Sequence, residues 1–326
     1  MQTTSSKLQH GRIRTVAAIG VLAVFGGVGY LFWSGAGPLP DPEGCSVSVG
    51  GVEVRLDTEQ AENATTIAAV AVRRGLPARA ISIAIATAFQ ESKLINVSHG
   101  DRDSLGLFQQ RPSQGWGTEE QIMDPYYSAN KFFDALVNVD GYEEMRITEA
   151  AQEVQRSAFP EAYEDHAEGA RALASALTGY SPRAHLSCVV DESDQDEQDL
   201  EETGLTGRAD AVRRELAQAF GDLSLGGFAP GGVSTGHMEG SAHYEGRALD
   251  IFVRPISPEN KRTGWTIAQY LVAHAERLGI AHVIFDDRIW TVGRSSEEGW
   301  RNYDPPERTG DRAILEHRDH VHVDVG

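Results

Sequence analysis

Cysteine and positive charge are both scarce in this sequence. Only two of the 326 residues are cysteines, and neither Cys45 nor Cys188 lies in a Cys-x-x-Cys pair or a cluster of cysteine and histidine. Any metal site must therefore be built from histidine and carboxylate side chains. Lysine and arginine together number 29 against 48 aspartates and glutamates, which gives a formal net charge of -19. Because phosphate binding needs clustered basic side chains, this charge argues against nucleic acid as a partner.

Long apolar runs are scarce as well, and the clearest one lies near the N-terminus. Residues 15–33 are uncharged and follow Lys7, Arg12 and Arg14. Their number is close to the ~20 residues that cross a bilayer as a helix, so we expect a transmembrane anchor. The basic flank predicts a cytoplasmic N-terminus at residues 1–14 and an extracellular location for the rest of the chain. A cleaved signal peptide is the alternative, but the run is longer than usual and no clear cleavage site follows.

The rest of the chain has room for two domains of ordinary size. Residues 34–44 are rich in proline and glycine and predict a stalk. A dense acidic run within residues 191–206 cannot bury apolar surface and repels itself, so we expect a linker there. It separates a first domain at residues 45–190 from a second at residues 207–326.

The two cysteines lie close to the two ends of the first domain. Disulfides persist in exported proteins, so we expect Cys45 and Cys188 to be bonded and to close this domain. Two unpaired buried thiols are the less favoured alternative.

The first domain contains a helix that predicts a general acid. The run from Ala80 to Phe89 is apolar on nearly every face, which is typical of a buried helix, and it leads into Glu91. Partial desolvation at the end of such a helix favours the protonated carboxyl group, as a general acid requires. Gln109 and Trp116 follow, and these residue types hydrogen-bond to sugars and stack on them. Together they indicate a glycan-binding cleft.

Gln90-Glu91-Ser92, followed by Gly106-Leu107-Phe108-Gln109, resembles the lysozyme-like, lytic transglycosylase superfamily. The resemblance covers about residues 45–185 and implies a mainly α fold. In that family the glutamate protonates the bond between N-acetylmuramic acid and N-acetylglucosamine, which would be the role of Glu91. Transglycosylases manage with one carboxylate, whereas hydrolases usually need two, and Asp101 and Asp103 leave hydrolysis open. The family's Tyr-Asn-Ala-Gly element has no counterpart here.

The second domain carries three residues suited to binding a divalent metal ion. His243 and Asp250 can meet if the turn at Gly246 folds the segment back. On a C-terminal strand, His320 and His322 share one face because successive side chains alternate. Two imidazoles and a carboxylate are a typical set for catalytic zinc, which keeps a fourth position for water. The surrounding pattern predicts an α+β domain, with a helix over 266–278 and a hairpin turning at Asp286-Asp287.

His243-Tyr-Glu-Gly-Arg-Ala-Leu-Asp250 and His320-Val-His322 resemble the D-Ala-D-Ala carboxypeptidase and hedgehog metallopeptidase superfamily. The resemblance covers about residues 209–326. It implies Zn²⁺ as cofactor, with His243, Asp250 and His322 as ligands. His320 would support the ligands or stabilise the transition state, and Arg247 would contact substrate.

The general base of the second domain is open between several residues. We rank Asp319 first, as the carboxylate three residues before the last histidine, and Glu316 second. On a regular strand Asp319 would face away from His320, so it serves only if the strand begins after it or bulges. His317 and His237 are further candidates.

Together these features predict a multi-domain protein, with a mainly α lysozyme-like domain and an α+β zinc-peptidase-like domain behind one transmembrane helix. Both domains would act on peptidoglycan, the first on its glycan and the second on its peptide stems. The alternative is a non-catalytic wall-binding or morphogenetic scaffold in which zinc is a structural ion.

Overall fold

The computed structural model describes residues 44–192, 198–305 and 310–326. The expected cytoplasmic segment, transmembrane helix and nearly all of the stalk lie outside the described residues, as does part of the acidic linker. Within the described ranges, no helix is both long enough and apolar enough to cross a membrane. The described residues form one compact unit.

A small antiparallel sheet joins the two ends of the first half of this unit. β1 (Gly44–Val49) and β2 (Val52–Leu56) form a hairpin through a Gly-Gly turn. β3 (Ser187–Val189) pairs with the other edge of β1, which gives the strand order β2-β1-β3. This register sets Cys45 opposite Cys188, and the two cysteines form a disulfide.

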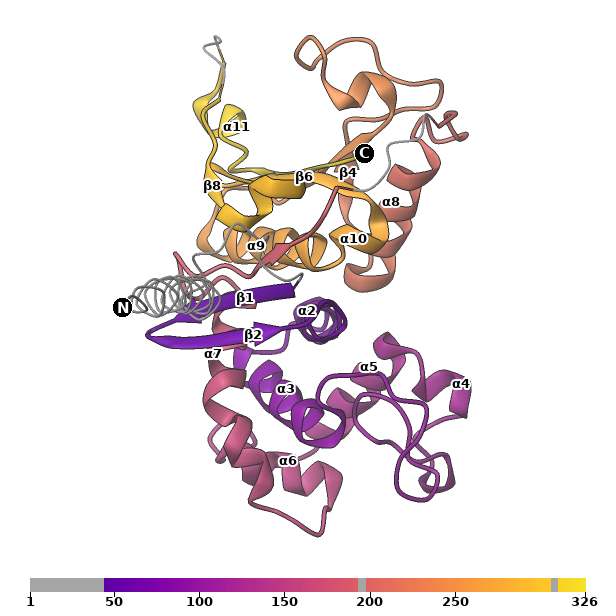
Figure 1. Ribbon diagram of the computed structural model, residues 1–326, viewed down its shortest axis with the longest axis vertical. Coiled ribbons are helices and arrows are strands. Elements are labelled where there is room, and N and C mark those ends of the chain that lie inside the picture. The colour runs from indigo at the N-terminus through magenta and orange to yellow at the C-terminus, as the bar shows by residue number, and fades with distance from the viewer. Residues whose placement is uncertain (1–43, 193–197, 306–309) are drawn as a thin grey trace, which may run out of the picture. The chain divides into compact units, whose positions relative to one another are not determined.

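Helices fill the chain between β2 and β3 (Figure 1). They are α2 (Thr58–Arg73), α3 (Ala78–Ser92), α4 (Glu119–Ile122), α5 (Pro125–Leu136), α6 (Ile147–Gln155) and α7 (Ala167–Leu177). α3 packs against α2, α5, α6 and α7, and all its residues from Ala80 to Ala88 are buried. It ends where Lys93 adopts a left-handed conformation, so Glu91 lies in its last turn. The apolar sequence of α3 thus places a carboxyl group at the edge of the core.

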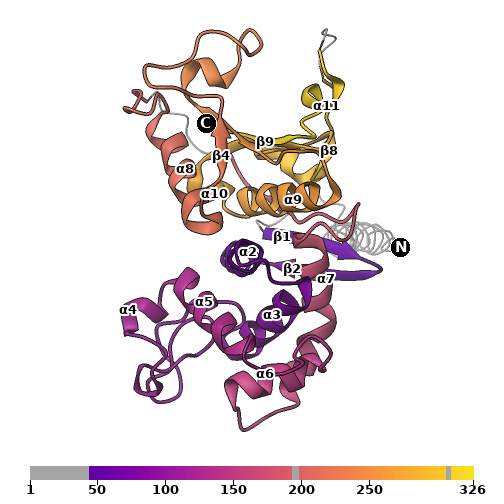
Figure 2. The same cartoon turned by 180° about the vertical axis from the view of Figure 1, so that it is seen from behind.

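The second half is built on a six-stranded antiparallel sheet, in the order β4-β5-β9-β6-β7-β8. Its strands are β4 (Ser224–Gly226), β5 (Ala248–Phe252), β6 (Ile280–Phe285), β7 (Arg288–Thr291), β8 (Arg301–Asn302) and β9 (His320–Val325). Its helices are α8 (Gly207–Phe220), α9 (Pro258–Ala273), α10 (Ala275–Leu278) and α11 (Arg312–Leu315). Figures 1 and 2 show α9 running along one face of this sheet, and α9 contacts both β6 and β9.

One hydrophobic core runs through both halves. α2 packs directly against α9, and both helices bury residues around most of their circumference. Polar groups cross the same boundary, because the hydroxyl groups of Tyr126 and Tyr270 both donate to Glu215 Oε1, at 2.8 and 3.0 Å. The cluster of buried apolar side chains is therefore continuous from Cys45 to Val325.

The fold class predicted from the sequence is wrong. It set a mainly α domain apart from an α+β domain behind a transmembrane helix. The structure instead gives one compact unit of mixed helix and strand over the described residues. The expected transmembrane helix lies outside these residues. The physical reason is that α2 packs directly against α9, so each helix buries apolar surface against the other half. Burying that surface stabilises the fold by about 25 cal/mol per Å², which favours docking of the halves.

Candidate metal centre

The site residues of the second half come from two neighbouring strands and one short helix. β5 and β9 are antiparallel, and their register sets Asp250 opposite His322. Along β9 the valines 321, 323 and 325 are fully buried in the core, so His320 and His322 share the other face. His243 lies on a 3₁₀ helix, Ala242–Glu245, which ends at Gly246 with a φ of 67°. The left-handed glycine turns the chain back into β5.

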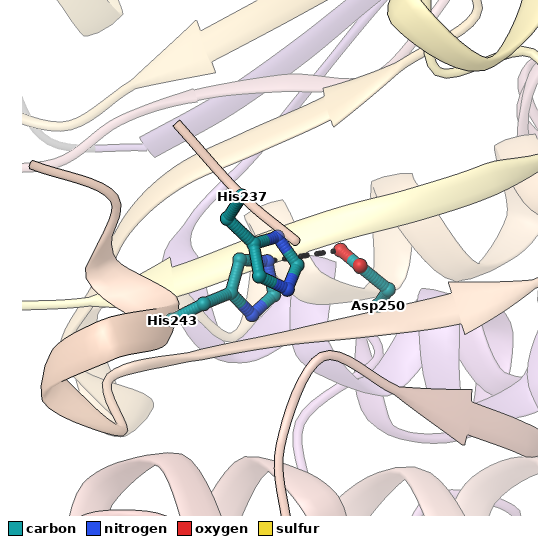
Figure 3. A group of neighbouring side chains, drawn as sticks. All are labelled: His237, His243 and Asp250. Atoms are coloured by element: carbon teal, nitrogen blue, oxygen red, sulfur yellow. Dashed lines mark ion pairs between the residues drawn. The ribbon is translucent and has the colours of Figure 1, made fainter. Parts of the chain in front are cut away.

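Three predicted ligand atoms meet at one point. His322 Nδ1 lies 3.0 Å from Asp250 Oδ1 and 3.1 Å from His243 Nε2. His243 Nε2 lies 3.3 Å from the same carboxylate oxygen. Figure 3 marks this ion pair with a dashed line. Ligands held about 2.0–2.1 Å from a tetrahedral zinc ion would stand roughly 3.3 Å apart. The spacing of these atoms therefore fits a zinc ion.

The outer atoms of both imidazoles are also fixed. His243 Nδ1 donates to the carbonyl oxygen of Gly227 at 2.8 Å, which leaves Nε2 directed at the centre. His322 Nε2 lies 3.3 Å from Asp324 Oδ2, and the other oxygen of Asp324 binds His282 Nδ1 at 2.8 Å. Such partners orient metal-binding histidines and raise their basicity. Only glycine fits at position 227, where a Cβ would stand 2.3 Å from His243 Cε1.

The electrostatics of the metal-free centre favour charged groups. Burial would raise the pKa of Asp250, but hydrogen bonds with His243 and His322 outweigh it and hold the pKa well below its usual range. Burial would lower the pKa of His322, but hydrogen bonds with Asp250 and Asp324 outweigh it and raise the pKa to about 9. A metal ion would therefore displace a proton when it binds.

His237 is close enough to join the group. His237, His243 and Asp250 each offer an atom within 4.8 Å of the others, so they could hold a metal ion (Figure 3). In the sequence His237 stood out only as a candidate near the rim of the site. His282 and Asp324 were not predicted, although Asp324 lies two residues beyond His322 and so shares its face of β9.

The two predicted bases point away from the centre. Asp319 Oδ2 pairs with Arg254 at 2.6 Å, and Asp319 Oδ1 accepts from His320 Nδ1 at 2.8 Å. Glu316 Oε2 pairs with Arg318 at 2.6 Å. Neither carboxylate lines the cavity of about 550 Å³ at the centre, whereas His320 does. Asp319 thus orients an imidazole.

His320, His317 and Arg247 also line this cavity. His320 Nε2 lies 3.9 Å from Asp250 Oδ1, so its free nitrogen faces the centre. His317 is packed between His320 and Tyr303, with ring centroids 4.6 and 5.0 Å away. Arg247 also lines the cavity, but its guanidinium binds Glu245 Oε2 at 2.7 Å and the Val325 carbonyl at 2.7 Å. Arg247 therefore ties β5 to the last residues of the chain.

The residues predicted for a glycan cleft line a second cavity, of about 1370 Å³. Glu91, Gln109 and Trp116 all belong to its wall. Glu91 Oε1 accepts a hydrogen bond from the buried Tyr163 hydroxyl at 2.7 Å. Burial, then the charge of Glu91, raises the pKa of Tyr163, so the phenol stays a donor. No sequence pattern pointed to this contact, because the two residues lie 72 positions apart.

Asp103 has a local structural role at this cleft. Its carboxylate accepts from the Ser113 backbone at 2.8 Å and pairs with Arg111 at 2.7 Å. The Ser113 and Arg111 hydrogen bonds lower the pKa of Asp103. Of the two predicted aspartates, exposed Asp101 lies in the cavity wall, which also carries Asp140 and Glu153.

A family model described as VldE, C-terminal domain, matches residues 201–313. The chain is similar to this family over roughly a third of its length. The matched region contains His237, His243 and Asp250, and ends before His320 and His322. No curated protein matches the chain. The match shows a similarity of this one region, and it does not link the region to the carboxypeptidase superfamily.

Proposed function

We propose that the chain is a zinc-dependent hydrolase that acts on the peptide stems of peptidoglycan. The observation that carries the proposal is the convergence of His243 Nε2, His322 Nδ1 and Asp250 Oδ1 within 3.0–3.3 Å of one another. This donor set and spacing suit zinc, and the centre opens into a cavity large enough for part of a peptide. The choice of wall peptide as substrate rests on the resemblance of this segment to the D-Ala-D-Ala carboxypeptidase and hedgehog superfamily.

The protein's own residues suggest how the reaction would be supported. Zinc at this centre would polarise a carbonyl group and lower the pKa of a bound water. His320 holds Nε2 toward the centre, where it can accept a proton or donate to a carbonyl oxygen, and Asp319 fixes its Nδ1. Asp324 and Gly227 hold the two ligand imidazoles in place. With Asp319 and Glu316 engaged elsewhere, His320 is the best-placed proton carrier.

A second activity, on glycan, is favoured by one observation in the other half. Glu91 lies in the wall of the large cavity with Gln109 and Trp116, and Tyr163 fixes one of its oxygens. We propose that Glu91 protonates a glycosidic oxygen there. The Cys45–Cys188 disulfide supports an oxidising compartment outside the cytoplasm, where peptidoglycan is found.

The rival proposal is a wall-binding scaffold with a structural ion. It is favoured by the absence of Asp319 and Glu316 from the cavity wall at the centre. Both proposals require zinc, and only the first requires new products.

Mass spectrometry of peptidoglycan fragments after incubation with the zinc-loaded chain separates the two. We expect cleaved peptide stems with the wild type and with His99→Ala, an exposed histidine outside the centre, but not with His322→Ala. Products with cleaved glycan should be absent with Glu91→Gln and present with the wild type and the other two variants. If the zinc-loaded wild type yields no new fragments, both activities are excluded and the scaffold remains. If it binds no zinc, the scaffold reading fails as well.

A further inference from the structure

His237 is the half-buried residue of an otherwise exposed loop. Residues 234–240 are exposed apart from His237, which is half-buried. Gly236 and Gly240 flank it with φ angles of 98° and 75°, and open space surrounds both positions. A loop with glycines in left-handed conformations and no packing against them can move at little cost.

The inward side chain reaches the proposed zinc ligands. The ring of His237 stacks on that of His243, with centroids 3.8 Å apart and an angle of 21° between the planes (Figure 3). Its ligand atom lies within 4.8 Å of those of His243 and Asp250. Ligands of one tetrahedral zinc ion stand roughly 3.3 Å apart, so His237 has to approach His243 and Asp250 by at most about 1.5 Å.

A single hydroxyl group holds this part of the loop in place. The Tyr244 hydroxyl accepts from the His237 backbone N–H at 3.0 Å and donates to the His237 carbonyl at 2.7 Å. Tyr244 follows His243 directly, so the clamp joins the loop to the segment that carries a ligand. The chain thus fixes the backbone of His237 while the rest of the loop stays unpacked.

We propose that His237 is a displaceable fourth ligand of the zinc ion, so that the resting centre is closed. A zinc site with four protein ligands has no position for water, whereas a catalytic site keeps one open. Substrate entry then requires that the loop of residues 234–240 withdraw His237. The inference rests on the proposed zinc site and adds a regulatory state to it.

Counting imidazole ligands by X-ray absorption at the zinc edge tests this directly. The zinc-loaded wild-type chain should show three imidazoles, from His237, His243 and His322. His237→Ala should show two, and its affinity for zinc, measured by chelator competition, should fall at least about 10-fold, because even the partners that orient ligands are worth 10–100-fold. Thr235→Ala, an exposed residue on the same loop, should match the wild type in both measurements.

Tyr244→Phe provides a second variant that keeps every ligand and removes only the clamp. It should lower both the mean imidazole count and the zinc affinity, but by less than His237→Ala lowers them. At zinc saturation, His237→Ala should also hydrolyse substrate faster than the wild type, which a purely structural role would not produce.

The outcomes distinguish this inference from the proposed function. Two imidazoles in the wild type, with no change in His237→Ala, would overturn the fourth ligand and leave the hydrolase proposal intact. A wild-type chain that binds no zinc would overturn both.

Discussion

Asp319 and Glu316 are both close to His320 in sequence, yet their neighbours differ. Asp319 Oδ1 holds His320 Nδ1 at 2.8 Å, whereas Glu316 pairs with Arg318 and Arg312 near α11. A carboxylate that binds the outer nitrogen of an imidazole fixes its orientation and tautomer. The structure therefore gives the two acidic residues separate roles.

These roles predict different effects of two matched substitutions. Asp319→Asn should lower kcat for peptide hydrolysis by roughly 10–100-fold with little change in zinc content, because His320 loses its orienting partner but no ligand changes. The kcat of Glu316→Gln should stay within a few-fold of the wild-type value. Steady-state kinetics with zinc quantitation of both variants checks this. A larger loss of kcat in Glu316→Gln than in Asp319→Asn would contradict the assignment.

At the scale of elements, the sequence predicts one helix over 266–278, whereas the structure has two, α9 and α10. α9 begins earlier, at Pro258, because Ser257 caps it by accepting a hydrogen bond from the Asn260 backbone. It ends before His274, which separates it from α10. His274 is buried, stacks on Tyr270 with centroids 4.0 Å apart, and donates from Nδ1 to the Tyr270 carbonyl at 2.8 Å. A buried neutral histidine thus closes the long helix.

This histidine predicts part of the acid sensitivity of the fold. Burial lowers the pKa of His274 to about 4, against about 6.5 in an unfolded chain. The unfolded state therefore binds the proton first, and stability falls as the pH drops from about 6.5 to about 4. Between pH 7 and pH 5, His274 should therefore lower the free energy of unfolding by an amount on the order of 2 kcal/mol. Urea unfolding at both pH values should show a smaller loss of stability in His274→Gln than in the wild type.

The control for this measurement is His99→Gln, which changes an exposed histidine. Its pH profile should follow that of the wild type. If His274→Gln loses as much stability between the two pH values as the wild type, His274 is not responsible.

The hairpin of β6 and β7 shows which elements local sequence determines. It turns at Asp286 and Asp287, as predicted, and both residues have positive φ angles, of 50° and 59°. Aspartate tolerates this conformation, which a two-residue hairpin turn of the right twist requires.

β9 begins at His320, directly after Asp319, which was the condition for Asp319 to face the centre. Its side chain turns to Arg254 instead, a long-range contact that strand periodicity does not predict.

At the scale of the whole molecule, the Cys45–Cys188 disulfide closes a loop across the first half. The two cysteines are 143 positions apart and join β1 to β3. β3 in turn supports the second half, because the Cys188 carbonyl accepts from the Trp290 indole at 3.1 Å. The bond is therefore placed where the chain passes from one half to the other.

Removing the disulfide should destabilise both halves together. Loss of so long a closed loop costs roughly 4–5 kcal/mol in the chain-entropy model. The Cys45→Ser/Cys188→Ser double variant should therefore unfold at lower denaturant, in one transition reported by tryptophans of both halves. Trp116 lies in the first half, and Trp265, Trp290 and Trp300 lie in the second. Separate loss of the first half alone would show that the halves do not depend on each other.

The sequence by itself determined the chemistry at short range. The spacing of His243 and Asp250 around Gly246, the alternation that puts His320 and His322 on one face, and the apolar helix leading to Glu91 all follow from local backbone geometry. Only the tertiary structure decided which groups meet across long separations: Asp319 with Arg254, Tyr163 with Glu91, and α2 with α9. Such contacts depend on how buried surfaces and polar partners are satisfied over the whole core, which no local pattern records.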